Sequence, residues 1–362
     1  MRDYVERINT AWRSEEPAYR YSLLALLLAG VAIRAAFLFQ PLRYDEGITY
    51  LMYASRPLSV GLSNYLMPNN HLLNTMLIHF STRLFGSSVW AIRLPDFIAG
   101  VLVLPATYLV VRKLYNKWAA LIATALAVPS FLLVAYSTDA RGYMLQALVF
   151  LVMIVLALRV KRMRSGWAPF AILAALAFFD MPTSLYFVGA LVVWMLLSAL
   201  LGDTWEPKYR FISKLAASCL GAAVLTFLLY LPVITNTGIS SITSDPWFAS
   251  LPWHVFAGQL PGHLSDTWAS WNHDLPIVLT VLLVVGFLAS IILHRRMARD
   301  RVNLALVIIG WSALVFFAQR SVPFVRTWCR SCRSTWGSPR RVSTTSARGL
   351  SHGHAPGGSC PP

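Results

Sequence analysis

The stretch SLLALLLAGVAIRAAFLFQPLRYDEG, residues 22–47, decides the fold. Its first part is an apolar run that can cross a bilayer, because about 20 apolar residues span the hydrocarbon core as one helix. Pro41, a basic residue and two adjacent carboxylates, Asp45 and Glu46, follow directly. The stretch therefore predicts a membrane-spanning helix that brings two acidic side chains to the membrane surface.

The composition of the whole chain agrees with this prediction. Of the 362 residues, 57 % are hydrophobic and only 13 % are charged, whereas soluble domains carry about 25 % charged residues. The few charges exclude a soluble surface. The high hydrophobicity excludes a disordered or nucleic-acid-binding chain, despite the net charge of +16. We therefore predict an all-α polytopic membrane protein that is surrounded by membrane lipid.

The lengths of the apolar runs predict nine membrane-spanning helices. Their approximate ranges are 21–40, 95–115, 117–136, 143–159, 166–180, 183–201, 214–235, 274–293 and 302–319. Two long segments, about 41–94 and about 236–273, connect spans on the same side of the membrane. Both are too apolar to be free tails, so we expect amphipathic helices that lie on the membrane surface.

The basic residues predict the orientation of the chain. If the N-terminal segment 1–20 is inside, the inside segments carry 18 Lys and Arg and the longer outside segments carry seven. An excess of Lys and Arg in short loops marks the cytoplasmic side. We therefore expect a multi-pass protein of the inner (plasma) membrane with a cytoplasmic N-terminus and with the segments 41–94 and 236–273 on the periplasmic or extracellular side.

The C-terminal tail differs from the rest of the chain. Residues 329–362 contain no Ile, Phe, Met, Tyr, Lys, Asp or Glu. This composition has two interpretations, which are a frameshift near Trp328 that removes a natural C-terminal part and a genuine disordered tail. We therefore expect the transmembrane domain to cover residues 21–328.

The first candidate site is the pair Asp45 and Glu46. Two adjacent carboxylates that face a lipid-borne substrate suit a general base or a metal ligand. The alternative is a helix start, with Asp45 as the N-cap and Glu46 in the first turn. The two interpretations are compatible with each other.

The second candidate site precedes the apolar residues 72–86. Asn70 is expected to cap a helix there, and His71 beside it is a candidate metal ligand. His71 and His79 are separated by about 12 Å of helical rise, so they cannot share one metal ion. We therefore expect His71 to be the functional histidine and His79 to be a packing residue.

The third candidate site is the loop Asp139-Ala140-Arg141-Gly142-Tyr143. In the functional interpretation Arg141 binds a phosphate and Asp139 joins the acidic site. In the alternative the loop is a local turn with an ion pair, and Tyr143 belongs to the aromatic belt at the membrane surface.

Three further ionisable residues map near the same surface. Arg93 is either an interface anchor or a phosphate contact. Arg34, inside the first span, either has a function or extends its guanidinium outward to the surface. Asp180 is most simply a turn residue at the outer face.

The candidate residues all map to the outer face, and the middles of the spans are almost free of charge. This pattern favours an enzyme with an outward-facing site at the lipid boundary. An ion-coupled transporter would instead place charged or broken helices near the midplane, with inverted repeats, and the sequence shows neither.

On these residues, the chain resembles the GT-C superfamily of polyprenyl-phosphate-sugar-dependent glycosyltransferases, and within it the bacterial relatives of protein O-mannosyltransferases and of the lipid A aminoarabinose transferase. The resemblance covers about residues 20–328 and is strongest from 40 to 145. It rests on the order of the motifs Tyr44-Asp45-Glu46, Pro68-Asn69-Asn70-His71, Leu84-Phe85-Gly86, Arg93-Leu94-Pro95 and Ala140-Arg141-Gly142-Tyr143.

The resemblance implies a GT-C-like helical bundle that moves a sugar from a polyprenyl-phosphate donor to a protein, lipid or glycan acceptor on the outer side. It makes Asp45, beside Glu46, the essential carboxylate, which acts on the acceptor directly or through a divalent metal ion. Arg93 and Arg141 would then neutralise the leaving phosphate. The remaining substrate-binding candidates are Asn70, His71, Asp139 and Tyr143.

The chain also departs from these relatives. The aminoarabinose transferase has a Glu-Lys pair where this chain has Asn69-Asn70-His71, so a metal ion there would depend on His71. Family members commonly have more than nine spans. Because the missing spans would lie where the tail begins, an inactive, truncated family member stays open as an alternative. A transporter or flippase of lipid-linked intermediates is a second alternative, from another function class.

Overall fold

The computed structural model describes residues 15–67, 69–163, 165–243, 250–272 and 275–321. Pro68, the tail 329–362 and most of the N-terminal segment 1–20 lie outside these residues. The described residues form helices and no strand, which confirms the predicted all-α fold.

The helices range from three to 29 residues in length. Most are α-helices, whereas η1 is a π-helix and η2 is a 3₁₀-helix. In chain order they are α2 (Pro17–Phe37), α3 (Tyr44–Ile48), η1 (Thr49–Ala54), α4 (Leu58–Ser63), α5 (Leu72–Phe85), α6 (Val89–Leu114), α7 (Lys117–Ala127), α8 (Phe131–Ser137), α9 (Tyr143–Met163), α10 (Trp167–Asp180), η2 (Pro182–Ser184), α11 (Leu185–Leu200), α12 (Lys208–Asn236), α13 (Ser240–Thr243), α14 (Trp253–Asn272), α15 (Ile277–Ile292), α16 (His294–Met297) and α17 (Leu304–Gln319).

Five helical segments of the described chain are long and apolar enough to cross a membrane. They are α2, α6, α9, α12 and the combined segment of η2 and α11. The bent pairs α7–α8 and α14–α15 raise the number to seven if each pair is one span. The other two predicted spans form α10 and α17, which are apolar but have only 14 and 16 residues. All nine predicted stretches are thus helical, but five to seven of them, rather than nine, have the length of a span.

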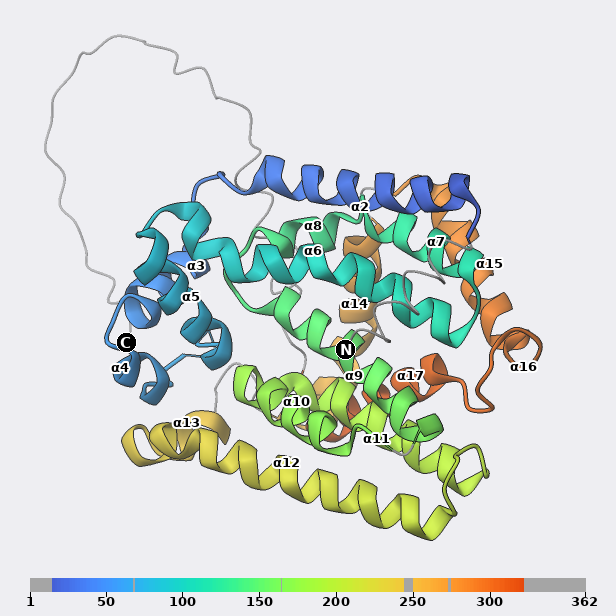
Figure 1. The fold of residues 1–362 in the computed structure, drawn as a ribbon. Helices are drawn as coiled ribbons and strands as arrows, with labels where there is room; N and C mark the ends of the chain where they lie inside the picture. The colour runs from blue at the N-terminus through green and yellow to red at the C-terminus, as the bar shows by residue number, and fades with distance from the viewer. Residues whose placement is uncertain (1–14, 68, 164, 244–249, 273–274, 322–362) are drawn as a thin grey trace, which may run out of the picture. The chain divides into compact units, whose positions relative to one another are not determined.

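The main core lies where α9, α10, α11 and α12 pack together. Its buried members include Met153, Phe170, Leu191 and Trp194. Helix α6 packs against α5, α7, α8 and α9, so it joins this core to the first part of the chain. Figure 1 shows α2 on one side of the bundle and α12 on the other, with α6 and α9 to α11 between them.

Helices α3, α4 and α5 gather at one end of the bundle, on the left of Figure 1. The turn between α8 and α9 reaches the same end, because the backbone N–H of Ala140 donates to Glu46 Oε1 at 3.0 Å. We call this region the site end, and it consists of residues 41–47, 69–74, 93–96 and 138–143. It brings the three candidate sites of the sequence together.

The third predicted span is broken, although the sequence analysis expected unbroken spans. Helices α7 and α8 meet at 65° on either side of Pro129, because proline has no N–H to donate and clashes with the preceding turn. Arg34 binds carbonyls at this break, at 3.3 Å to Val128 O and 3.5 Å to Ala127 O. Its Nε also donates to Ser137 Oγ at 3.1 Å. Arg34 is therefore fully buried and does not extend to the surface.

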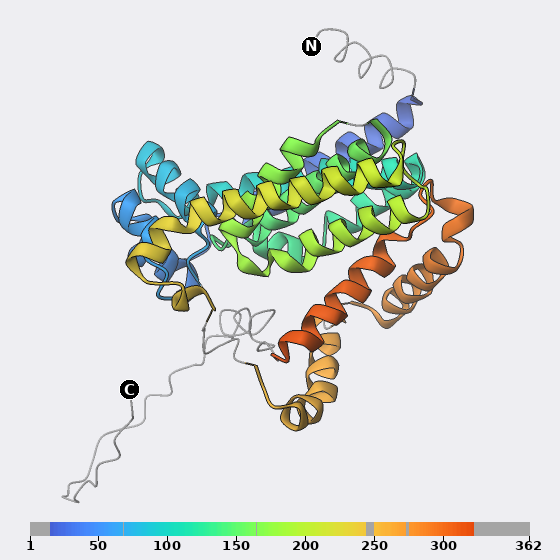
Figure 2. The same cartoon turned by 90° about the horizontal axis from the view of Figure 1, so that it is seen from below.

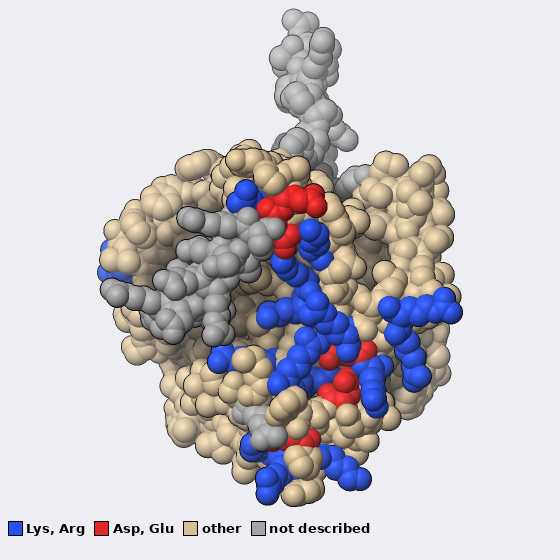
Figure 3. Space-filling view, turned by 45° about the vertical axis from the view of Figure 1, so that its right-hand side comes forward, with Lys and Arg blue, Asp and Glu red and all other residues tan. Residues whose placement is uncertain are grey.

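The opposite end of the bundle is rich in basic residues. Figure 3 shows Lys and Arg side chains gathered over this part of the surface. Lys161, at the end of α9, is buried there, with its Nζ 2.8 Å from Asp300 Oδ1 and 3.2 Å from Asp203 Oδ2. These ion pairs tie α9 to the segments that precede α12 and α17.

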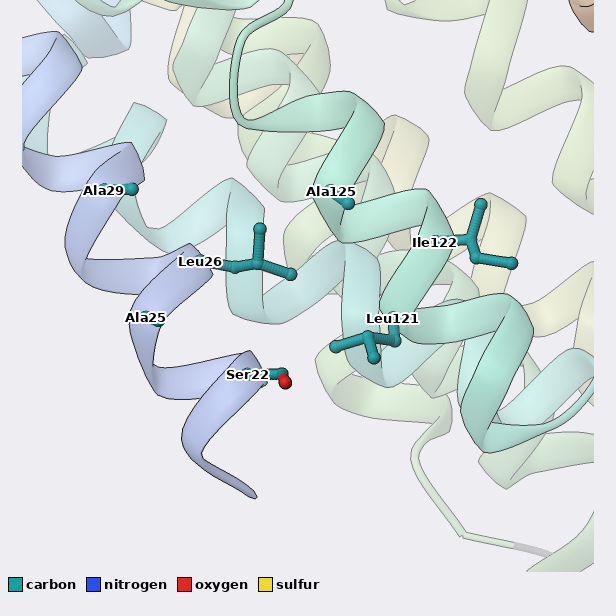
Figure 4. Close-up of a pocket in the computed structure, with 7 residues that line it drawn as sticks. All are labelled: Ser22, Ala25, Leu26, Ala29, Leu121, Ile122 and Ala125. Atoms are coloured by element: carbon teal, nitrogen blue, oxygen red, sulfur yellow. The ribbon is translucent and has the colours of Figure 1, made fainter. Parts of the chain in front are cut away.

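Two apolar features lie outside the core and away from the site end. Helix α15 is exposed along almost its whole length, and Figure 2 shows α14 and α15 to one side of the bundle. A shallow apolar groove also runs between α2 and α7 (Figure 4). It is lined by Ser22, Ala25, Leu26, Ala29, Leu121, Ile122 and Ala125.

Candidate active site

Glu46 is the most enclosed carboxylate of the site end. It is fully buried and accepts hydrogen bonds from Arg93 Nε at 2.7 Å and Arg93 Nη2 at 2.6 Å. The backbone N–H groups of Arg43 and Ala140 donate to it at 2.8 and 3.0 Å. Glu46 lies in the first turn of α3, and its bond to the Arg43 N–H is part of a capping box. Four donors therefore occupy its two oxygens.

Arg93 is enclosed to the same degree, with 1 % of its side chain exposed. Besides Glu46 it binds the carbonyl oxygens of Leu38, Gln40 and Pro41 at 3.0, 2.7 and 3.0 Å. These carbonyls follow the C-terminus of α2, where a helix leaves acceptors unpaired. The pair thus joins the end of α2, helix α3, helix α6 and the turn after α8, and neither side chain keeps a polar atom for a substrate.

Asp45 is the accessible carboxylate of the site end, with 33 % of its side chain exposed. Its Oδ2 lies 2.9 Å from Arg141 Nη1, and its Oδ1 accepts from Asn69 Nδ2 at 3.2 Å. Arg141 Nη2 donates to Asn69 Oδ1 at 3.2 Å and so closes the triangle. Arg43, not Asp45, is the N-cap residue of α3, so the predicted capping role of Asp45 is wrong. Two residues singled out in the sequence, Asp45 and Arg141, are thus in direct contact.

Asp139 lies beside this triangle and pairs with Arg43. Arg43 Nη1 is 3.1 Å from Asp139 Oδ2, whereas the local-turn interpretation expected a pair within the loop. Burial raises the pKa of Asp139 to about 6, the negative charge of Glu46 adds to the rise, and Arg43 and Arg141 oppose it. Asp139 therefore belongs to the acidic site through its charge.

Helix α5 begins after His71, so His71 and not Asn70 occupies the N-cap position. Asn70 is fully buried and fixes the preceding loop instead. Its Nδ2 donates to the carbonyl oxygens of Gly61 and Asn64 at 2.9 and 2.6 Å. Asn70 thus holds in place the loop that presents Asn69 to Asp45, and the prediction that it caps the helix is wrong.

The His71 ring is buried next to Tyr143, with the two ring centroids 5.5 Å apart. Its Nε2 is a buried atom without a hydrogen-bond partner in the described part of the chain. Burial lowers the pKa of His71 to about 3, with a smaller contribution from the positive charge of Arg141. The ring is therefore neutral at pH 7. Tyr143 also lies under the Arg141 guanidinium, whose carbon is 5.1 Å from the centre of its ring.

The arrangement does not fit a divalent metal ion. Such an ion needs several oxygen or nitrogen ligands that converge on one point. The part of the chain that the structure describes contains no group of three or more His, Cys, Asp or Glu side chains that could hold one. Asp45 is bound to a cation of the protein itself, and His71 has no second ligand beside it. We therefore derive no step through a metal ion.

The structure adds residues that the sequence analysis did not select. Arg43 contacts Asp139, and Asn69 contacts Asp45. In the sequence, neither residue could be distinguished as functional except by its position next to the candidate residues. Asp96 is different, because it is a carboxylate inside an apolar span, and an ionisable residue in a span is a functional candidate by default. That signal was present in the sequence and was overlooked.

A comparison with known proteins supports the resemblance. Residues 72–234 match the sequence model of the dolichyl-phosphate-mannose-protein mannosyltransferase family, which belongs to the GT-C superfamily. The matched segment contains Arg93, Asp139, Arg141 and Tyr143, and it begins after Asp45. No curated protein and no solved structure matches the chain. The predicted resemblance is thereby confirmed over residues 72–234.

The buried pair gives a prediction for stability. Arg93→Leu leaves the charge of Glu46 buried without its cation, and removing one partner of a buried pair costs about 3–5 kcal/mol. We expect the free energy of unfolding in mixed micelles to fall by this amount. The matched control is Arg159→Leu, which removes an exposed guanidinium whose Nε donates to Ser165 Oγ at 3.1 Å, and a change of about 0.5 kcal/mol or less is expected. An equal loss of unfolding free energy in the two variants would contradict the importance of the buried pair for stability.

Asp139 gives a prediction for the pH dependence of stability. Its pKa is raised to about 6 in the folded protein, so between about pH 4 and pH 6 the folded state binds more protons than the unfolded state. This carboxyl therefore lowers the free energy of unfolding as the pH rises through that range. In Asp139→Asn this contribution is absent, so the difference between variant and wild type should change over pH 4–6 and level off above it. A difference that is constant with pH would contradict the raised pKa.

Proposed function

We propose, from the match of residues 72–234 to the dolichyl-phosphate-mannose-protein mannosyltransferase family, that the chain moves a sugar from a polyprenyl-phosphate donor to an acceptor hydroxyl at the outer face of the membrane. The family supports a membrane glycosyltransferase with a polyprenyl-phosphate sugar donor. The observation that supports transfer at this particular site is the contact of Asp45 with Arg141 at the site end, where an accessible carboxylate and a cation lie 2.9 Å apart.

In this proposal Asp45 is the base for the acceptor. Its carboxylate takes the proton of the acceptor hydroxyl while the hydroxyl oxygen forms a bond to the anomeric carbon of the sugar. The bond between that carbon and the phosphate breaks, and the polyprenyl phosphate leaves with the electron pair. The acceptor is a protein, a lipid or a glycan, because all three carry such hydroxyl groups.

Arg141 is the residue we assign to the leaving phosphate. Two of its nitrogens face Asp45 and Asn69, while Nε has no hydrogen-bond partner in the described part of the chain. A guanidinium suits phosphate because its N–H groups match the spacing of two phosphate oxygens. Neutralising the charge that develops on the leaving group lowers the barrier to transfer. Tyr143 and the neutral His71 form the wall beside this guanidinium.

Glu46 and Arg93 take a different role from the one expected from the sequence. Every polar atom of the two side chains has a protein partner, so neither is available to the acceptor or the phosphate. We assign both as positioning residues that set Asp45 against Arg141. Asn70 is assigned the same kind of role for Asn69.

We also propose that the site end faces outward and that the N-terminus is cytoplasmic. The described members of the basic clusters predicted to be inside belong to the ends of α2, α6, α9, α12 and α15–α16 that lie opposite the site end, where Lys and Arg gather on the surface (Figure 3). An excess of basic residues marks the cytoplasmic side. A donor whose lipid chain lies in the membrane would then present its phosphate to Arg141 at the outer surface.

The break between α7 and α8 favours a second candidate, the movement of lipid-linked intermediates across the membrane. Transporters use broken helices and ionisable residues within the membrane as binding sites, and Arg34 lies at this break. However, the Arg34 nitrogens donate to backbone carbonyls and to Ser137, so they stabilise the bend. We therefore rank transfer above transport.

Asp45→Asn tests the proposed function. The variant keeps the shape of the side chain but loses the base, so we expect transfer of labelled sugar from polyprenyl-phosphate donors in membranes to fall at least about 100-fold, as for the loss of a general base. The amount of folded protein should be unchanged. The control is Asp266→Asn, which alters an exposed carboxylate of α14 and should retain full activity. Full activity in Asp45→Asn would rule out its assignment as the base.

Single cysteines test the orientation. Tyr44 is 82 % exposed at the site end and Arg296 is exposed at the opposite end, so each tolerates replacement by cysteine. In intact cells an impermeant maleimide should label Tyr44→Cys, whereas Arg296→Cys should react only after permeabilisation. The opposite pattern would reverse the topology. The background lacks the native thiols of Cys219, Cys329, Cys332 and Cys360.

A further inference from the structure

Two buried carboxylates lie behind the candidate active site. Asp96 in α6 and Asp180 at the end of α10 are 0 % and 1 % exposed. Within the described part of the chain, no Lys or Arg nitrogen lies within 4.0 Å of either carboxylate. Asp180 is therefore not the surface turn residue that the sequence suggested. Because an unpaired buried charge is costly, the contacts of these two groups need an explanation.

Asn74, in the first turn of α5, connects the two carboxylates. Its Nδ2 donates to Asp96 Oδ2 at 2.9 Å, and its backbone N–H donates to Asp180 Oδ1 at 2.9 Å. Asp180 Oδ2 also accepts from Gln146 Nε2 at 2.8 Å. The start of α5 is thus fixed between α6 and α10 by neutral donors. We call Asp96, Asn74 and Asp180 the carboxylate platform.

Gly142 lies directly on this platform. A Cβ atom at Gly142 would be 3.1 Å from Asn74 Cβ and 3.1 Å from Asp180 Oδ2, so the backbone is in close contact with both residues. Gly142 also has a φ of +71°, a conformation that glycine adopts and other residues rarely do. Gly142 follows Arg141 in the chain. By fixing the backbone of Gly142, the platform therefore also fixes the position from which the Arg141 side chain extends toward Asp45.

We infer that Asp96, Asn74 and Asp180 are positioning residues that hold Gly142, and through it Arg141, in the place where Arg141 meets the phosphate of the donor. This inference rests on the proposed function for the role of Arg141, but the placement of the turn does not depend on it. Glu46 binds the Ala140 N–H on one side of Arg141, and the platform supports Gly142 on the other. The turn is therefore fixed on both sides of its functional residue.

The platform predicts that position 96 needs an oxygen acceptor and not a charge. In Asp96→Asn the amide oxygen can still accept from Asn74 Nδ2, so the bond that fixes the start of α5 is kept. In Asp96→Leu the side chain has nearly the same size but cannot accept. Asn74 then loses its bond, and the support under Gly142 is weakened.

Hydrogen exchange tests the placement without reference to activity. In the full chain in detergent, amide exchange of peptides that cover residues 138–146 should be faster in Asp96→Leu than in wild type and unchanged in Asp96→Asn. Tyr108→Phe is the matched control, because it removes a buried hydroxyl with hydrogen bonds from the other end of α6. It should leave these peptides unchanged. Equal exchange in Asp96→Leu and wild type would overturn the inference.

A double-mutant cycle tests whether Asp96 affects the reaction through the placement of Arg141. A misplacement of about 1 Å costs about 100-fold in rate, so Asp96→Leu should lower kcat/KM about 100-fold in the wild type. In an Arg141→Lys background it should lower kcat/KM less than about threefold, because residues that act through one another are not additive. Asp96→Asn should stay within about threefold of wild type. Equal fold-losses in both backgrounds would overturn the inference. If the wild type transfers no sugar, the exchange result still decides the placement, and only the proposed function fails.

Discussion

The ion pair of Glu46 with Arg93 is the interaction on which the arrangement of the site end depends. The two side chains are almost completely buried, and Arg93 donates two hydrogen bonds of 2.6 and 2.7 Å to Glu46. A buried pair of this kind contributes to stability only when the remaining donors and acceptors are also satisfied. Here they are satisfied by the backbone of the segment after α2, of α3 and of the turn after α8. The pair thus joins residues 38–46, helix α6 and the turn after α8, three segments that are far apart in the sequence.

This constraint explains why two carboxylates that are adjacent in the chain have different roles. In the first turn of α3, Glu46 points into the bundle and Asp45 stays one-third exposed beside Arg141. The carboxylate platform supports the same turn from behind, so Arg141 is fixed by protein contacts on either side. Such rigid support is what a site needs in order to stabilise charge as it develops on a leaving group.

The sequence predicted the fold class and the helical character of all nine apolar stretches, and it singled out Asp45 and Arg141, which the structure brings into contact. These features follow from apolar run length and from the order of short motifs, which are local properties. The partner of a charged residue is not a local property. For that reason Glu46 and Arg93 were both expected to face the substrate, although they bind each other. The break at Pro129 was missed because a proline in an apolar run does not show whether a neighbouring helix binds the freed carbonyls.

The central claim is that the site end receives the phosphate of a polyprenyl-phosphate donor. The most direct measurement is photocrosslinking of the full chain in membranes with a polyprenyl phosphate that carries a photoreactive group next to its phosphate. The account predicts crosslinked peptides from residues 41–47, 69–74 and 138–143, with loss of labelling in Arg141→Gln. Crosslinks confined to the opposite end of the bundle, around residues 292–303, would contradict it.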